Sequence, residues 1–306
     1  MTGLELSHEY YVNCCRPVLE RELGADARLI AAGLVGEGSD CFGYDDETSR
    51  DHDWGPRVCL WLPDGELERL RGPAQIAFSH FPTEYRGYTA VRGPAGRSGA
   101  FGTGRFYEML TGLPHAPETN EQWLSVPEPR FAAAVNGEVF FDGTGEFTSV
   151  RNALLAYYPE DVRLRRLAEC AALAAQTGQY NLTRCRLRGE DAAAGVIKGR
   201  FAEAAVQMAF LLGKRFRPFY KWSFRALREL PGIGSEMDGL FTELFCWNDA
   251  YAENLAVSRI CALIIGEMHR QGITKSDGGF LMDCVSEILS RIRDPELAEK
   301  GISLVF

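Results

Sequence analysis

A glycine-serine pair and two alternating aspartates lie close together near the start of the chain. Gly38 and Ser39 open the segment GSDCFGYDDETSRDHDW, and Asp51 and Asp53 stand near its end. A glycine turn lets backbone approach a phosphate, and carboxylates on residues i and i+2 of a strand share one face. Two such acids can hold divalent metal ions that clamp the attacking and leaving oxygens of a displacement at phosphorus. The pattern therefore predicts a metal-dependent nucleotidyl-transfer site.

Two other interpretations of this segment stay open. Acidic pairs often lie on solvated loops, and Pro56 is poorly tolerated inside a central strand, so the aspartates could lie on a bulge or at a strand entrance. His52 and Asp53 could also form the core of a metal-dependent phosphohydrolase. That enzyme class needs further histidines on neighbouring helices, and the chain offers four others: His8, His80, His115 and His269.

Two basic and aromatic segments later in the chain could bind a nucleotide. The segment GKRFRPFYKWSFRALREL carries Arg217 and Lys221, whose charges suit a triphosphate, and aromatic rings on which a base can stack. The segment QYNLTRCRLRGE offers Arg184 close to Tyr180. A helix with a solvated basic face, whose aromatic side chains fill the domain interface, explains the first segment slightly better than nucleotide binding does. A surface helix explains the second segment nearly as well as nucleotide binding does.

Composition limits the class of protein. The chain has 306 residues, 46% of them hydrophobic, which is typical of a globular protein with one or two domains. A net charge of −9 argues against a protein that coats long nucleic acid, because such binding needs many cations on the phosphates. We find no signal-peptide pattern and no apolar run long enough to span a bilayer, so we expect a cytoplasmic protein without a membrane partner.

The 9 cysteines form no C-x-x-C pair and have no histidine partners at zinc-finger spacing. Several lie in apolar or helical stretches, where a free cysteine behaves as a small hydrophobic residue. We therefore expect reduced, structural thiols rather than a zinc site or disulfides.

The first half of the chain is predicted to alternate helices and strands. Apolar spacing predicts a helix over residues 4–23, closed by Gly24. Strands are predicted at 29–36 and 58–62, followed by a helix at ELERLRG. Residues 72–105 show weak periodicity, which predicts one or two short strands in a mobile lid or a substrate-facing loop region.

The second half is predicted to be mostly helical. FYEMLTGL predicts a short helix, and FAAAVNGEVFFDGTG predicts a hairpin that turns at Asn136-Gly137. After Phe147 the chain shows helical periodicity, with breaks expected at Pro159, Gly178, Pro218 and Pro231. We therefore expect two domains, 1–150 and 151–306.

The chain resembles DUF4037, a bacterial family of domains of unknown function that is nucleotidyltransferase-like. The resembling segments are GEGSDCFGYDDETSRDHDWGP, TGLPHAPET, NGEVFFDGTGEF, LLAYYPEDVRL, GQYN with Arg184, and FYKW with Leu227. The resemblance implies an α+β fold, in which a polymerase-β-like nucleotidyltransferase domain with a mixed sheet flanked by helices precedes an α-helical bundle domain. It also implies that Gly38 and Ser39 contact phosphate and that Asp51 and Asp53 bind metal.

The same resemblance implies a third acid on a later strand, which serves as metal ligand or general base. The strand where we expect it, SGAFGTG at 98–104, contains no carboxylate. Asp142 is the preferred substitute, and Glu138 is the second choice.

Two functions follow as expectations. In the first, Mg²⁺ and ATP, or another nucleoside triphosphate, bind at Ser39, Asp51 and Asp53, and a nucleoside monophosphate passes to a hydroxyl or amine. The acceptor is an unidentified small molecule or a short RNA or protein. In the second, which the absent third acid favours, the protein binds nucleotide without transferring it and is a sensor or partner module.

Overall fold

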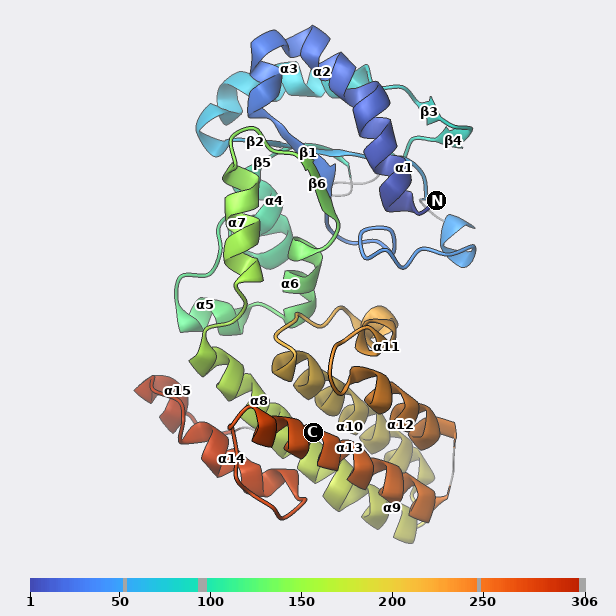
Figure 1. Cartoon of the computed structure of the whole chain (residues 1–306), viewed down its shortest axis with the longest axis vertical. Helices are drawn as coiled ribbons and strands as arrows, with labels where there is room; N and C mark the ends of the chain where they lie inside the picture. The colour runs from blue at the N-terminus through green and yellow to red at the C-terminus, as the bar shows by residue number, and fades with distance from the viewer. Residues whose placement is uncertain (52–53, 93–97, 247–248, 303–306) are drawn as a thin grey trace. The chain divides into compact units, whose positions relative to one another are not determined.

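A computed structural model describes residues 1–51, 54–92, 98–246 and 249–302, with Asp51 described by its backbone alone. The chain divides into two compact units, Met1–Ala156 and Tyr157–Phe306 (Figure 1). The first unit combines a small sheet with helices, and the second contains helices. The protein is thus of the α+β class.

The first unit contains a four-stranded mixed sheet. Its strands, in the order β5-β2-β1-β6, are β5 (Gly99–Gly102), β2 (Cys59–Leu62), β1 (Ala31–Leu34) and β6 (Glu138–Phe141). β1 is antiparallel to both β2 and β6, whereas β5 is parallel to β2. The strands predicted at 29–36 and 58–62 are therefore confirmed. Because of these directions, the carboxyl end of β1 meets the amino ends of β2, β5 and β6 at one end of the sheet.

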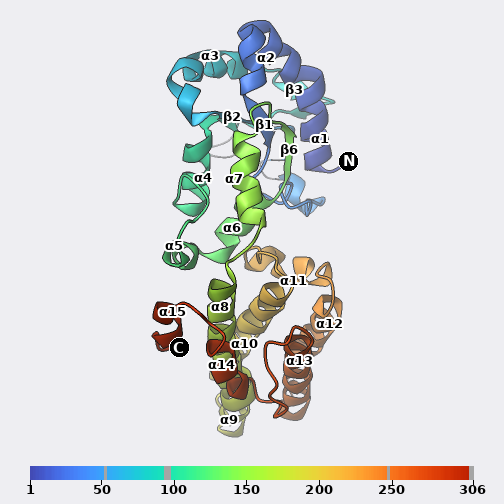
Figure 2. The same cartoon turned by 60° about the vertical axis from the view of Figure 1, so that its left-hand side comes forward.

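Helices cover both faces of this sheet (Figure 2). Successive strand residues point to opposite faces, so Leu60 and Leu62 pack with the N-terminal helix and α3 (Leu67–Ser79). Trp61 points to the other face, where its ring stacks on Phe147 with 3.7 Å between ring centroids. The helices that follow β5 in the chain are α4 (Thr103–Thr111), α5 (Asn120–Ser125), α6 (Glu128–Val135) and α7 (Glu146–Leu155).

The helix predicted over residues 4–23 is confirmed. It consists of α1 (Gly3–Tyr10), the π-helical turn η1 (Tyr11–Cys15) and α2 (Arg16–Leu23). Thr2 opens it with a capping box, and Pro17 is tolerated because it lies in the first turn of α2. Gly24 closes it with a φ of 57°, which favours glycine.

The predicted irregular region at 72–105 is wrong in its first part. After the short turn η4 (Asp64–Glu66), α3 continues through Pro73 to Ser79. Proline removes one helical hydrogen bond, but the fully buried Ala74 and Ala77 anchor the rest of the helix in the core. The hairpin β3 (Glu84–Tyr85) and β4 (Tyr88–Thr89) then follows, and residues 93–97 lie outside the described residues.

The hairpin predicted at FAAAVNGEVFFDGTG is also wrong. Its first half is α6, which Pro129 initiates and three alanines favour, and only its second half is a strand, β6. β6 pairs with β1 and not with the preceding FAAAV segment, which was its expected partner in the hairpin. Asn136-Gly137 therefore joins a helix to a strand.

Asp51 does not lie on a strand. It ends the 3-10 turn η3 (Thr48–Asp51), which begins where the Asp46 carboxylate accepts a hydrogen bond from the backbone N–H of Ser49. β2 begins only at Cys59, after Pro56. The expectation of two acids alternating along a strand is thus wrong for Asp51, and Asp53 lies outside the described residues.

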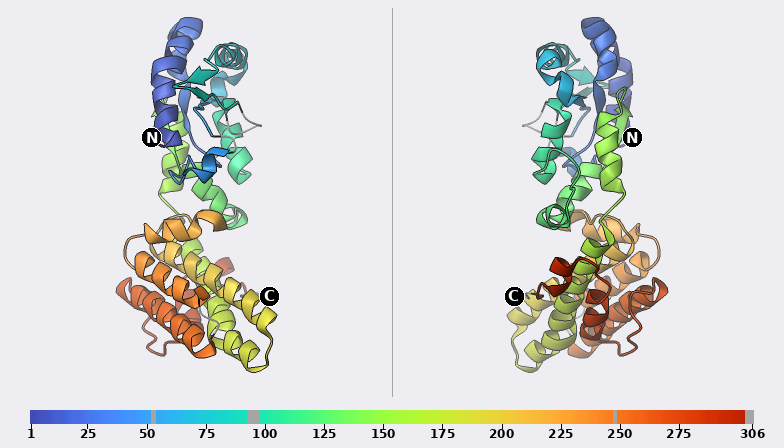
Figure 3. Two further views of the ribbon diagram at one scale, coloured as in Figure 1. Left: turned by 90° about the vertical axis from the view of Figure 1, so that its right-hand side faces the viewer. Right: turned by 90° about the vertical axis from the view of Figure 1, so that its left-hand side faces the viewer.

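The second unit is built from packed helices (Figure 3). They are α8 (Glu160–Ala174), the π-helical η5 (Ala175–Leu182), α9 (Thr183–Leu187), α10 (Asp191–Leu212), α11 (Tyr220–Arg228), α12 (Gly234–Cys246), α13 (Ala250–Arg270), α14 (Leu281–Leu289) and α15 (Pro295–Glu299). The breaks predicted at Pro159, Pro218 and Pro231 are confirmed. The break predicted at Gly178 is wrong, because η5 continues through that residue, which packs closely on the Phe201 ring.

The alanine-rich helix α10 packs against α8, η5, α11 and α13. Lys198 of α10 belongs to a buried ionic network. In this network the Glu253 carboxylate accepts hydrogen bonds from Lys198 Nζ at 2.8 Å and from Arg186 Nη2 at 2.6 Å. This network connects α9, α10 and α13. None of the helices in the described ranges is both long and apolar enough to cross a membrane.

Candidate functional site

The glycine-serine turn follows β1 at the end of the sheet where β2, β5 and β6 begin. Gly36 and Gly38 have φ values of 127° and 144°, which other residues rarely adopt. The Ser39 carbonyl oxygen then accepts hydrogen bonds from the N–H groups of Phe42 and Tyr44. The two glycines of this turn are thus required by its backbone shape.

A buried ion pair links the turn to the entrance of β2. Arg57 donates from Nε to Asp40 Oδ2 at 2.9 Å and from Nη2 to Asp40 Oδ1 at 2.5 Å, and both residues are less than 5% exposed. A Cβ on Gly38 would lie 2.5 Å from Asp40 Oδ1 and 2.6 Å from Arg57 Nη2. Gly38 is therefore needed to let the backbone cover this pair.

The ion pair sets the charge states around it. Burial works to lower the pKa of Arg57, but the neighbouring Cys41 and Asp40 outweigh it and raise that pKa. Burial raises the pKa of the Cys41 thiol, whose Sγ lies 3.4 Å from Arg57 Nη2. Arg57 thus stays charged and Cys41 stays a neutral thiol at neutral pH.

Asn136 holds the turn from the other side. Its Oδ1 accepts a hydrogen bond from the N–H of Gly36 at 2.9 Å, and its Nδ2 donates to the carbonyl oxygen of Gly36 at 2.7 Å. The guanidinium of Arg151 donates to the carbonyl oxygens of Asn136 and Gly137, at 2.7 and 3.2 Å. The turn is therefore tied to both β6 and α7.

Asp45 connects the loop to the N-terminal helix. Its Oδ2 accepts hydrogen bonds from the N–H of Gly3 at 2.7 Å and from Trp54 Nε1 at 2.9 Å. Its Oδ1 is buried and finds no hydrogen-bond partner among the described residues. Asp45 thereby fixes Trp54, the residue that follows Asp53.

The turn presents unused hydrogen-bond donors. Among the described residues, no acceptor is found for the four successive N–H groups from Glu37 to Asp40 or for the half-buried hydroxyl of Ser39. Successive backbone N–H groups and a hydroxyl are the groups that bind phosphate oxygens. Binding of a nucleotide's phosphates by this turn stays a prediction.

The expected metal ligands lie beside this turn in the sequence, but their side chains lie outside the described part of the protein. Asp51 ends η3, and Asp53 stands four positions before Arg57. Within the described residues, no three His, Cys, Asp or Glu side chains are grouped to hold a metal ion. Metal binding by Asp51 and Asp53 stays a prediction.

The histidines proposed for a phosphohydrolase site contact other groups. His8 pairs with Glu138, His80 with Glu22, and the ring of His115 bonds to the backbone of Ala116. His52 lies outside the described residues. The ring of His269 lies 3.0 Å, Nε2 to oxygen, from the backbone carbonyl of Ser276. The phosphohydrolase interpretation stays a hypothesis.

The two candidate third acids have other partners. Asp142 accepts hydrogen bonds from the N–H groups of Gly145 and Thr148, each at 2.8 Å, and so holds the start of α7. Glu138 pairs with His8 Nδ1 at 2.9 Å. β5 carries no carboxylate, as the sequence already indicates.

The candidate nucleotide-binding cations lie in the second unit. Arg184 donates from Nη1 to the Tyr180 hydroxyl at 2.8 Å, and Lys221 lies over the ring of Trp222 at 5.0 Å. Arg217 is partly buried just before α11. Their role in binding a nucleotide stays a prediction.

Residues 123–223 match the model of a family described as a domain of unknown function, DUF4037. The chain carries a DUF4037 domain. No curated protein and no solved structure matches the chain. The DUF4037 domain includes Asn136 and Asp142, whereas Gly38, Ser39 and Asp51 precede it in the sequence.

Three residues of the site were missed in the sequence: Asp40 and Arg57, which precede the DUF4037 domain, and Asn136, which lies within it. Arg57 gave one signal, since a lone arginine directly before a buried strand needs a partner. Nothing in the sequence identifies that partner as Asp40 rather than its acidic neighbours. Asn136 was interpreted as a turn residue because it precedes glycine.

Proposed function

We propose that the protein is a metal-dependent nucleotidyltransferase. The observation that carries the proposal is the pairing of Arg57 with Asp40. It draws the segment that follows Asp51 and Asp53 against the glycine-serine turn, at one end of the sheet. A phosphate-binding turn and metal-binding acids need this proximity to act on one triphosphate.

Each part of the site has a role in the proposal. The N–H groups of Glu37 to Asp40 and the Ser39 hydroxyl bind the phosphates, and Asp51 and Asp53 hold Mg²⁺. Bound Mg²⁺ supplies positive charge that stabilises the transition state at the α-phosphorus. A hydroxyl or amine of the acceptor attacks that phosphorus, and pyrophosphate leaves. Arg184, Arg217 and Lys221 are the proposed further cations for the nucleotide.

The sheet supports a polymerase-β-like assignment of the first unit. A glycine-serine turn ends the first strand, the acids precede the antiparallel second strand, and the next strand of the sheet lies parallel beside it. This order matches the mixed sheet that the resemblance implies. ATP with Mg²⁺ is the proposed substrate pair, and the acceptor is a small molecule or a short RNA or protein.

A second candidate is nucleotide binding without transfer. It is favoured by the engagement of Asp142 with two backbone N–H groups, and of Glu138 with His8. With both acids engaged and none on β5, no candidate general base is available among them. The protein would then be a nucleotide sensor or partner module.

Transfer of label from α-³²P-labelled ATP with Mg²⁺ tests the proposal against this second candidate. A mixture of small-molecule hydroxyl and amine compounds, short RNA and protein serves as acceptor, and the Asp51→Asn, Asp53→Asn double variant is the control. If the wild type transfers label and releases pyrophosphate but the double variant does not, the transferase proposal is supported. Nucleotide binding without release of pyrophosphate on any acceptor supports the second candidate.

A further inference from the structure

We propose that Asn136 is a positioning residue, which fixes the turn from Gly36 to Asp40 in the shape that binds phosphate. The inference rests on the proposed function, because it concerns the same nucleotide site. Nothing in the family description assigns a role to this side chain.

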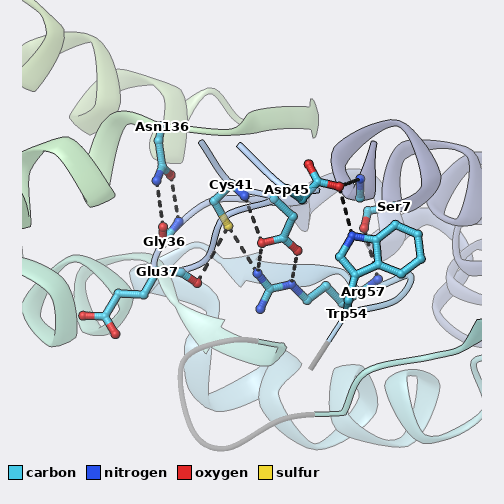
Figure 4. Close-up of polar contacts among 10 residues, drawn as sticks. Ser7, Gly36, Glu37, Cys41, Asp45, Trp54, Arg57 and Asn136 are labelled. Carbon is cyan, nitrogen blue, oxygen red and sulfur yellow. Dashed lines mark hydrogen bonds and ion pairs between the residues drawn. The ribbon is translucent and has the colours of Figure 1, made fainter. Parts of the chain in front are cut away.

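The contact between Asn136 and Gly36 uses both polar atoms of the side chain. The amide accepts from the Gly36 N–H at 2.9 Å and donates to the Gly36 carbonyl oxygen at 2.7 Å. Only an amide side chain presents a neutral donor and acceptor side by side in this way. Two hydrogen bonds to one residue fix its orientation as well as its position (Figure 4).

Asn136 is itself held in place. It follows the last residue of α6, and Arg151 donates to its carbonyl oxygen and to that of Gly137. Two residues after Asn136, Glu138 begins β6 opposite Leu34 of β1. The Asn136 side chain therefore fixes the turn relative to the sheet and α7.

Gly36 directly precedes the four N–H groups that the turn presents. Its φ of 127° is one of many that glycine can adopt, and no other atom would contact a Cβ at this position. Packing alone therefore does not fix Gly36. Without the two hydrogen bonds from Asn136, the turn becomes ordered only when the nucleotide binds. The free-energy cost of this ordering weakens nucleotide binding.

The test measures two affinities in Asn136→Ala and Asn136→Asp by calorimetry: that for ATP with Mg²⁺, and that for Mn²⁺ without nucleotide. Asn136→Asp keeps the size and the acceptor but loses the donor. Asn152→Ala, at an exposed position of α7, is the matched control. We expect both Asn136 variants to bind ATP about tenfold to a hundredfold more weakly, as is typical when a supporting residue is lost. Mn²⁺ affinity and the melting temperature of the free protein should stay near those of the wild type.

A further variant changes the other partner of this contact, Gly36. Gly36→Ala strains the backbone while leaving Asn136 intact, and we expect the same loss of ATP affinity. The inference is overturned if folded Asn136 variants bind ATP like the wild type. It is also overturned if ATP affinity, Mn²⁺ affinity and melting temperature fall together, since that pattern indicates a purely structural role. If the wild type binds Mn²⁺ but no nucleotide, the proposed function fails as well, so the two failures are distinguishable.

Discussion

Arg57 and Asp40, 17 positions apart in the sequence, form a buried ion pair with two hydrogen bonds beneath the backbone of Gly38. The pair closes the loop between β1 and β2 at its base. All residues of the predicted metal site lie between its two members. The pair therefore fixes the two ends of the loop segment that carries the predicted metal ligands.

Removing one member of the pair should strongly destabilise the protein. Asp40→Asn or Arg57→Met leaves a buried group without its charged partner, which costs about 3–5 kcal/mol of the free energy of unfolding. The double variant Asp40→Asn, Arg57→Met should be less destabilised than the sum of the two single changes, because neither residue is then left charged without its partner. Urea unfolding measures all three, and strictly additive effects would contradict the coupling.

Gly38→Ala should destabilise the protein more than Gly43→Ala. Both positions have positive φ, but only at Gly38 would the new Cβ lie within 2.6 Å of Asp40 and Arg57. At Gly43 the cost is backbone strain of about 1 kcal/mol, whereas at Gly38 we expect about 2–3 kcal/mol more from overpacking. Equal unfolding midpoints for the two variants would argue against close packing at Gly38.

Asp142 should affect stability more than nucleotide binding. Its two oxygens hold N–H groups at the start of α7, so Asp142→Ala should lower the free energy of unfolding by about 1 kcal/mol. Affinity for ATP with Mg²⁺ and label transfer should be unchanged. If transfer is instead abolished at unchanged stability, Asp142 is the third catalytic acid.

Glu253 should make the protein sensitive to acid. Burial acts to raise the pKa of Glu253, but hydrogen bonds from Arg186 and Lys198 outweigh it and lower that pKa. Its stabilising contribution is therefore complete above the unfolded-state pKa of about 4.3, and it is lost as pH falls through the lower, folded-state value. Melting temperatures from pH 7 to pH 2 should show this loss in the wild type.

A matched pair of variants isolates this effect. Glu253→Gln should lower the melting temperature at pH 7 and flatten its dependence on pH below about 4.3. Glu243→Gln removes an exposed ion pair with Arg259 and should change little. Identical pH profiles for the wild type and Glu253→Gln would show that the buried network does not set the acid sensitivity.

The strands and the first helix could be predicted because local signals agreed with the final packing. Residues 29–36 and 58–62 are apolar and bounded by turns, and the N-terminal helix has Thr2 and Gly24 as caps. Other predictions failed where tertiary contacts decide the structure. Pro73 is accepted inside α3 because Ala74 and Ala77, which follow it, are buried in the core, and β6 pairs with a strand far away in the sequence.

The site was predictable only in its residue types. Gly38 and Ser39 could be singled out because their order before the acids suits phosphate chemistry. The contacts that shape the turn join positions 17 and 100 residues apart, Asp40 with Arg57 and Gly36 with Asn136. Several acids near Arg57 were equally plausible partners, so local sequence could not identify the pair.

Calorimetry of ATP binding, with and without Mg²⁺, tests the central claim most directly. We predict that the wild type binds ATP tightly only with Mg²⁺, and that the Asp51→Asn, Asp53→Asn double variant loses this dependence while keeping its melting temperature. A double variant that binds ATP with Mg²⁺ as tightly as the wild type would contradict the account.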